Sequence, residues 1–154
     1  MNSPAHRLYA ALRHVPCDND AAALRPGLTH GDYTSPTRLA LEGERIFRRS
    51  WVCVGHDANI PAAGDYLVEA ILNHSVVAVR GDNGSINAFH NVCRHRGHTV
   101  AEGRGNARRL TCPYHAWTYD HDGSLFHAPH TNGVADVEKG QLGLRPVRLE
   151  RVVG

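Results

Sequence analysis

The sequence lacks most of the features that would assign it to a membrane or nucleic-acid-binding class. No apolar run approaches the roughly 20 residues that cross a bilayer. The N-terminus also has no apolar stretch of about 7–15 residues that would mark a secretory signal. The formal net charge is only +2 and the arginines are scattered, so a nucleic-acid partner is not expected. With 154 residues, 42% hydrophobic and 21% charged, the composition is typical of one ordinary soluble domain, and a cytoplasmic location is the default expectation.

Cysteine is scarce, and histidine is abundant in one stretch. The chain has four cysteines, at Cys17, Cys53, Cys93 and Cys112. A cytoplasmic setting favours metal binding or catalysis over disulfides for these residues. Seven of the twelve histidines lie from His90 to His130. We therefore expect any metal chemistry in that part of the chain.

The first 50 residues have a helical character. Residues 1–34 are expected to be an N-terminal arm with one short helix at about 5–14. Residues 35–50 are expected to form a lead-in helix, because Ser35 can cap a helix and Pro36 suits its first position.

From residue 51 onward the hydrophobic period changes to two, which is typical of strands. Turn sequences join several of these segments, with GDNG at 81–84 and HDG at 121–123. The Gly-rich stretch 101–107 is expected to be a loop, and 144–154 to begin a further strand. The strands themselves are expected at 51–55, 65–71, 75–81, 86–92, 108–112, 116–120 and 124–128. Many short strands at close spacing predict a mainly-β, antiparallel sandwich or barrel.

One spacing stands out among the cysteines and histidines. Cys93 and His95 form C-x-H, and after sixteen residues Cys112 and His115 form C-x2-H, each pair in a loop between strands. A Cys₂His₂ zinc site uses the same ligand types, but zinc fingers pair like ligands and place the histidines on a helix. A disulfide between the two cysteines is a second alternative. The third is a [2Fe–2S] cluster with two thiolates on one iron and two imidazoles on the other.

The wider sequence favours the third alternative. NVCRHRGH at 91–98 and CPYHAWTYDHDGSL at 112–125 closely resemble the Rieske domain of ring-hydroxylating-type non-haem iron oxygenases, found at the N-terminal end of their α subunits. The resemblance covers roughly 32–154. It implies a Rieske domain at 51–146, and at 147–154 the start of a catalytic domain that this chain does not contain.

The resemblance also implies a ligand set and a cluster type. Cys93 and Cys112 would hold one iron, and His95 and His115 the other. Rieske proteins of respiratory and photosynthetic complexes have a second cysteine pair that links the two loops, and a serine hydroxyl near the second histidine. The present chain instead has His98 and Tyr114 in place of those cysteines, and Trp117 in place of that serine. Fewer donors to the sulfur atoms predict a lower reduction potential.

Several residues near the motif have structural interpretations. Gly97 and Pro113 are expected to set loop geometry. Trp117 and Tyr119 are expected to pack beneath the cluster. Cys53 alternates within an apolar segment and is expected to be a small core residue.

Charged and histidine side chains around the motif leave more than one interpretation open. Arg94 and Arg96 could dock an acidic electron donor or could be solvated. His121, His127 and His130 are expected to be turn and surface residues and not a second metal site.

The resemblance implies a function in electron transfer. The domain would take electrons from a ferredoxin or a flavin reductase and pass them to a mononuclear Fe(II) held in the catalytic domain of a neighbouring subunit of a homo-oligomer. Aromatic hydroxylation is the preferred expectation for the parent protein. The alternatives are a quaternary-ammonium demethylase, a free-standing Rieske ferredoxin and a structural zinc module that binds another protein. The two-His-one-carboxylate site of the oxygenase reaction is not expected in this chain.

Overall fold

The computed structural model describes residues 27–129 and 139–152. The predicted helix at about 5–14 lies outside the described residues. The chain divides into two compact units, 1–40 and 41–154. The domain boundaries expected from the sequence remain predictions.

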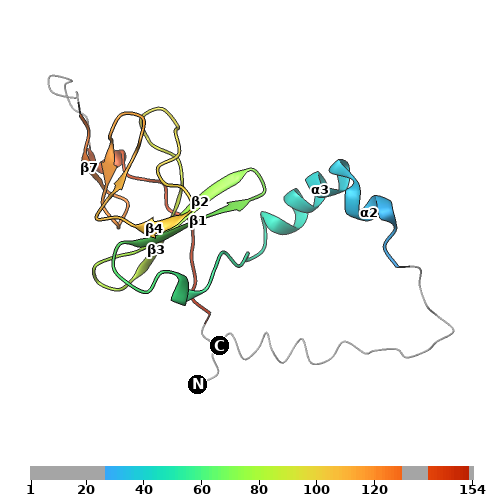
Figure 1. The fold of residues 1–154 in the computed structure, drawn as a ribbon. Helices are drawn as coiled ribbons and strands as arrows, with labels where there is room; N and C mark the ends of the chain where they lie inside the picture. Colours follow the sequence, from blue (N-terminus) through green and yellow to red (C-terminus); the bar gives the residue numbers. More distant parts are fainter. Residues whose placement is uncertain (1–26, 130–138, 153–154) are drawn as a thin grey trace. The chain divides into compact units, whose positions relative to one another are not determined.

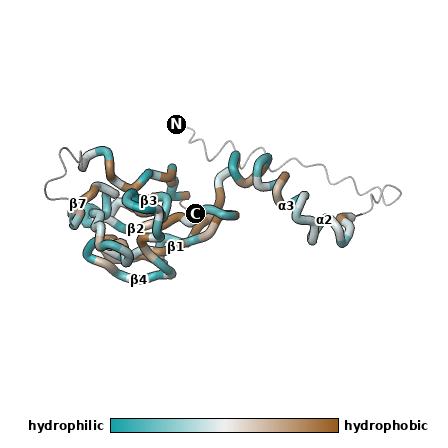
Figure 2. Tube along the Cα trace, turned by 90° about the horizontal axis from the view of Figure 1, so that it is seen from above, coloured by the Kyte–Doolittle hydropathy of each residue, from teal (hydrophilic) through white to brown (hydrophobic). Residues whose placement is uncertain are grey.

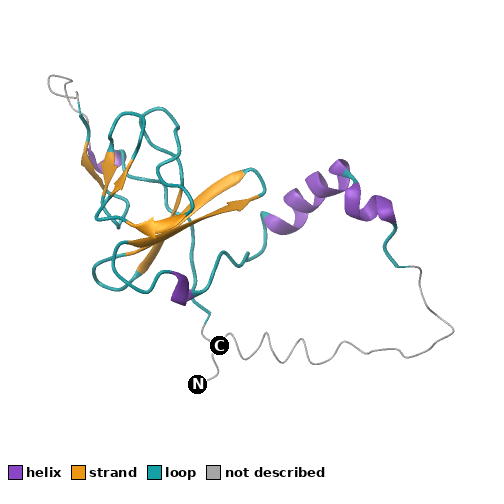
Figure 3. Ribbon diagram, in the orientation of Figure 1, coloured by secondary structure: helices purple, strands orange, loops and turns teal. Residues whose placement is uncertain are grey.

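The described part of the chain begins with short helices (Figure 3). Helix α2 (His30–Thr34) was not predicted, and Asp32 stabilises its start by accepting hydrogen bonds from the Thr29 N–H (2.7 Å) and hydroxyl (2.8 Å). Helix α3 (Pro36–Glu42) begins at the proline that the sequence placed there, and the helical path continues as the π-helix η2 (Gly43–Phe47). No helix in the described segments is both long enough and apolar enough to cross a membrane.

A four-stranded antiparallel sheet forms the larger layer of the second unit (Figure 1). It contains β1 (Asp65–Ile71), β2 (His74–Arg80), β3 (Ile86–His90) and β4 (Arg104–Asn106). The strand order is β3-β2-β1-β4, and the predicted turn at 81–84 joins β2 to β3. A short 3₁₀ turn, η3 (Asp57–Asn59), precedes the sheet.

A smaller antiparallel sheet follows, with the order β5-β6-β7. It contains β5 (Leu110–Thr111), β6 (Thr118–Tyr119) and β7 (Leu125–His127), and a final 3₁₀ turn, η4 (Lys139–Gln141), comes later in the chain. The predicted turn at 121–123 lies between β6 and β7. The mainly-β, antiparallel fold predicted from the sequence is thus confirmed.

Strand β2 lies between two core clusters because its side chains alternate between the faces of the sheet. Val77 and Val79 pack with Phe89 and the small-sheet residues, while Val76 and Ala78 belong to the second cluster on the other face. Hydrophobic and hydrophilic residues are accordingly interleaved along this unit (Figure 2). The first cluster matters for function because it includes the two cysteines of the motif.

Local predictions were wrong in three segments of the chain. Segment 51–55 forms no strand, and Cys53 is exposed and not a core residue. Segment 101–107 contains β4, whose residues are all exposed, so the strand has no hydrophobic period that could reveal it. Segment 144–152 forms no regular strand. It follows β3 through single hydrogen bonds, from His90 N to Arg145 O (2.9 Å) and from Val147 N to Ala88 O (2.8 Å).

Candidate metal centre

The two loops that carry the motif share one backbone design. In each loop the N–H of the cysteine donates to the carbonyl five residues on, and the carbonyl of the cysteine accepts from the N–H four residues on. The first bond is 2.8 Å and the second 3.0 Å in both loops, for the pairs Cys93–His98, Gly97–Cys93, Cys112–Trp117 and Ala116–Cys112. The loops are therefore similar in backbone geometry although their cysteine–histidine spacings differ.

The fourth residue after each cysteine has a left-handed backbone. Gly97 has φ +76° and Ala116 has φ +58°. Glycine adopts this conformation without steric cost, so the expected role of Gly97 in loop geometry agrees with the structure. Alanine incurs a cost of about 1–2 kcal/mol in the same conformation, and Ala116 directly follows a predicted ligand.

Replacing Ala116 with glycine is expected to raise the free energy of unfolding by about 1 kcal/mol, because the left-handed strain is released. The measurement is the midpoint of urea denaturation of the chain. Ala63→Gly is the matched control, since Ala63 is also exposed but has no positive φ, and we expect it to be destabilising. Equal effects of the two substitutions would contradict strain at residue 116.

The structure brings the four predicted ligands together as two pairs. Cys93 and Cys112 are each 2% exposed, and their thiols interact with each other. Burial, and to a lesser extent the neighbouring Cys93 thiol, raise the pKa of the Cys112 thiol. The rings of His95 and His115 lie with centroids 4.8 Å apart at 73°, and His95 is exposed. The site thus consists of a buried thiol pair and a more exposed imidazole pair.

This arrangement does not converge on a single ion. Within the described segments, no group of three or more His, Cys, Asp or Glu side chains is placed to hold one metal ion. The cysteines are free thiols in this structure and not a disulfide. Two pairs of different ligand type are the donor set of a [2Fe–2S] cluster with one all-cysteine and one all-histidine iron, so the residues fit that group.

Aromatic rings flank both imidazoles. Trp117 is 7% exposed and stacks on His95, with centroids 4.9 Å apart and an interplanar angle of 9°. Tyr114 is 56% exposed and packs on His115, with centroids 3.9 Å apart at 34°. These contacts limit the ring orientations available to both histidines. Trp117 is thus a buried packing residue, and its position beneath the cluster stays a prediction.

Tyr119 does more than pack. Its side chain is fully buried, and its hydroxyl lies 3.3 Å from the Cys93 sulfur and accepts a hydrogen bond from the Arg94 N–H (3.0 Å). Either atom could donate in this contact when Cys93 is a thiol, whereas a thiolate at Cys93 has no proton and can only accept from the Tyr119 hydroxyl. Burial raises the pKa of the Tyr119 hydroxyl far above its usual value, which keeps this donor protonated. Sequence reasoning missed this contact, since the two side chains are 26 positions apart.

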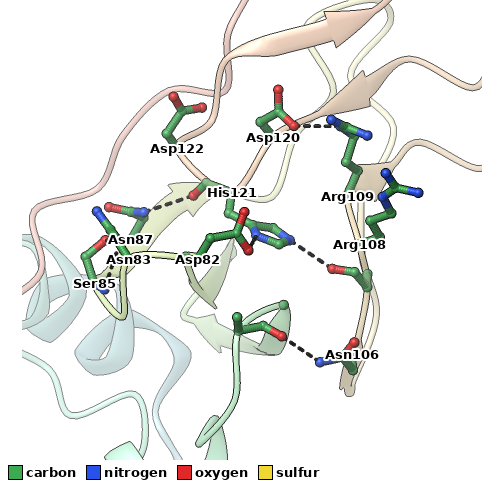
Figure 4. Close-up of a pocket in the computed structure, with 14 residues that line it drawn as sticks. Asp82, Asn83, Ser85, Asn87, Asn106, Arg108, Arg109, Asp120, His121 and Asp122 are labelled. Carbon is green, nitrogen blue, oxygen red and sulfur yellow. Dashed lines mark hydrogen bonds and ion pairs between the residues drawn. The ribbon is translucent and has the colours of Figure 1, made fainter.

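An open polar hollow is lined by residues of four stretches, 63–64, 81–87, 106–109 and 120–122, and by none of the four predicted ligands (Figure 4). Its polar groups bond to one another. The ring of His121 lies 2.8 Å from the Ala107 carbonyl, Asn87 donates to the His121 carbonyl (3.0 Å), and Arg109 pairs with Asp120 (2.6 Å). His121 is a turn residue as predicted, although its side chain is largely buried. His127 is exposed, and His130 lies outside the described residues.

Comparison with known proteins identifies the family of the chain. Residues 50–138 match the family model of the Rieske [2Fe-2S] domain. This match covers more than half of the chain, and the chain belongs to the Rieske [2Fe-2S] domain family. The resemblance to non-haem iron oxygenases is also confirmed by similar curated proteins and solved structures.

The curated relatives include oxygenase subunits that are much longer than this chain. The carnitine monooxygenase oxygenase subunit of Escherichia coli (strain K12) is 42% identical over 123 residues, which are 79% of this chain and 33% of the relative. The glycine betaine monooxygenase oxygenase subunit of Chromohalobacter salexigens is 44% identical over 123 residues, 79% of this chain and 27% of the relative. The chain therefore spans about a third of the length of such relatives.

Solved structures extend the same comparison. A quaternary ammonium Rieske monooxygenase in complex with L-carnitine has a TM-score of 0.71 at 38% identity, covering 78% of this chain and 34% of that one. Naphthalene 1,2-dioxygenase from Rhodococcus sp. bound to indole has a TM-score of 0.68 at 38% identity, covering 72% of this chain and 26% of that one. The β-fold described above is thus shared with both kinds of oxygenase.

Proposed function

We propose that Cys93 and Cys112 hold one iron of the Rieske cluster and that His95 and His115 hold the other. The observation that carries this assignment is the buried thiol pair beside the more exposed imidazole pair. Two neutral imidazoles leave less negative charge on their iron than two thiolates would, which raises the reduction potential relative to an all-cysteine cluster.

The surrounding residues define how electrons would enter and leave. The bound cluster would supply one-electron transfer. The thiols are buried with the core, whereas the exposed ring of His95 lies at the surface and can present its second nitrogen to a partner. Trp117 and Tyr114 hold the two imidazoles from the sides. The histidine edge is therefore the route that the chain offers to electrons.

We infer that the chain acts as the electron-transfer domain of a Rieske oxygenase. It would accept electrons from a ferredoxin or flavin reductase and pass them to a mononuclear iron in the catalytic domain of a neighbouring subunit. Support comes from the relatives, which are oxygenase subunits and align with 79% of this chain. A free-standing ferredoxin remains the alternative from another class.

For the substrate of the parent protein, the relatives favour quaternary ammonium compounds. The carnitine and glycine betaine oxygenase subunits are 42% and 44% identical to this chain. The aromatic substrate preferred from the sequence is the second candidate, supported by the similarity to naphthalene 1,2-dioxygenase. The parent oxygenase, supplied with reductant and either carnitine or naphthalene, would distinguish the two by substrate-dependent oxygen consumption.

Absorption and EPR spectra of the purified chain test the cluster assignment. A reduced chain with the rhombic EPR signal of a Rieske cluster is the expected result. A colourless, zinc-containing chain would overturn the assignment. Reduction of the chain by NADH through a flavin reductase then tests the electron-transfer role separately.

The Tyr119→Phe variant is expected to lower the reduction potential of the chain by roughly 50 mV. Loss of the hydroxyl removes a hydrogen bond to the Cys93 sulfur that stabilises the extra negative charge of the reduced state. The measurement is a redox titration followed by EPR. Tyr114→Phe is the control, because Tyr114 is exposed and its hydroxyl has no sulfur contact among the described hydrogen bonds. Equal potentials for wild type and Tyr119→Phe would contradict the role of the hydroxyl.

A further inference from the structure

The two cluster loops are closed at their base in different ways. The second loop is closed by strand pairing, with Leu110 opposite Tyr119 and Thr111 opposite Thr118. The first loop has no such ladder, because β3 ends at His90 and residues 99–103 form no strand. Another contact must therefore hold the two ends of the first loop together.

The side chain of Asn91 supplies that contact. Its Oδ1 accepts hydrogen bonds from the N–H groups of Val100 (2.9 Å) and Ala101 (3.0 Å). Its Nδ2 donates to the Ala101 carbonyl (2.8 Å) and to the Ser75 hydroxyl (3.0 Å). The Asn91 side chain thus bonds to residues 100–101 in place of a neighbouring strand. It also links the base of the loop to Ser75 on β2.

Because Asn91 is buried, losing these hydrogen bonds would destabilise the loop. Asn91 is 1% exposed, and among the described residues the other buried side chains of the core are apolar. An amide can donate two hydrogen bonds and accept two at its oxygen, and Asn91 makes all four. Its own N–H also donates to the Ser75 carbonyl (2.9 Å). Removing the amide would leave buried backbone groups without partners.

We infer that Asn91 is a positioning residue that closes the first cluster loop and so places Cys93 and His95 for iron binding. This inference rests on the ligand set proposed above. Asn91 is not one of the proposed ligands, and its amide bonds only to protein groups. It fixes residues 100–101 beside residue 91, and the segment between them, which carries both ligands, is held as a closed loop.

The test uses the full chain loaded with its cluster. Asn91→Ala removes all four side-chain bonds, and Asn91→Asp keeps an acceptor for Val100 and Ala101 but loses both bonds donated by Nδ2. Ser75→Ala removes one bond and leaves Asn91 in place. Asn87→Ala is the matched control, since Asn87 lies on β3 and its amide donates only to the His121 carbonyl. The readouts are the rate of iron release to a chelator, the EPR line width and amide exchange at Val100 and Ala101.

The expected iron release is at least about tenfold faster in Asn91→Ala and roughly two- to tenfold faster in Ser75→Ala, with Asn91→Asp between them. Broader EPR lines and faster exchange at Val100 and Ala101 should accompany the change, while Asn87→Ala matches the wild type. If Asn91→Ala fails to fold, Ser75→Ala and Asn91→Asp still decide the question through the same readouts. A Rieske signal in every variant with wild-type release rates and line widths would overturn the role of Asn91 alone. A wild-type chain without a Rieske signal would instead overturn the ligand assignment and, with it, this role.

Discussion

A His115→Cys variant is expected to retain an iron–sulfur cluster whose reduction potential is at least about 250 mV below that of the wild type. Clusters with four cysteine ligands have potentials near about −400 mV, whereas Rieske clusters lie at roughly −150 to +300 mV. A thiolate at residue 115 adds a negative charge to the iron that the imidazoles would otherwise hold, and this disfavours the extra electron. The potential is measured by redox titration of the cluster-loaded fraction.

His98→Cys is the matched control for this experiment. His98 lies in the first loop, is exposed, and contacts Tyr114 at a centroid distance of 5.6 Å. Its replacement adds a thiol near the site without changing the proposed ligands, so the potential should stay near the wild-type value. A His115→Cys variant that kept the wild-type potential would show that His115 is not a ligand.

The proposed ligand pattern could be predicted from the sequence because it depends on local spacing. Each loop needs a cysteine and, two or three residues later, a histidine, and the glycine at residue 97 is a local requirement of the same loop. Most strands of the two sheets were also predicted, because a half-buried strand alternates apolar and polar residues. Strand β4 was missed because it pairs through its backbone and buries no side chain.

Contacts between distant residues could not be predicted in the same way. No local sequence feature marks Tyr119 as a hydrogen-bonding partner of the Cys93 sulfur, because the two residues meet only when the second loop folds onto the first. Asn91 likewise meets Ser75 and Ala101 across two separate segments. The proposed ligands are therefore predictable from local spacing. The hydrogen bonds of Tyr119 and Asn91 around them depend on how distant segments pack together.

A Gly123→Ala variant is expected to lose about 2–5 kcal/mol of unfolding free energy. Gly123 has φ +84°, and a Cβ there would lie 2.3 Å from one ring carbon of Phe89 and 2.8 Å from another. The left-handed backbone contributes about 1–2 kcal/mol to the loss, and the overpacking about 1–3 kcal/mol. Phe89 is 4% exposed and cannot move into solvent without opening the core that contains both cysteines. Chemical denaturation of the chain measures the change.

Gly84→Ala separates the two causes. Gly84 has nearly the same backbone, φ +79°, but a Cβ there would meet no atom within 4 Å. It should lose only the left-handed cost of about 1–2 kcal/mol. The difference in unfolding free energy between the two variants then measures how closely the β6–β7 turn packs against Phe89. Phe89 lies two positions before Asn91, at the start of the first loop. Equal losses at both positions would mean that this turn does not pack closely on Phe89, and that the second loop is positioned by its own strand pairing.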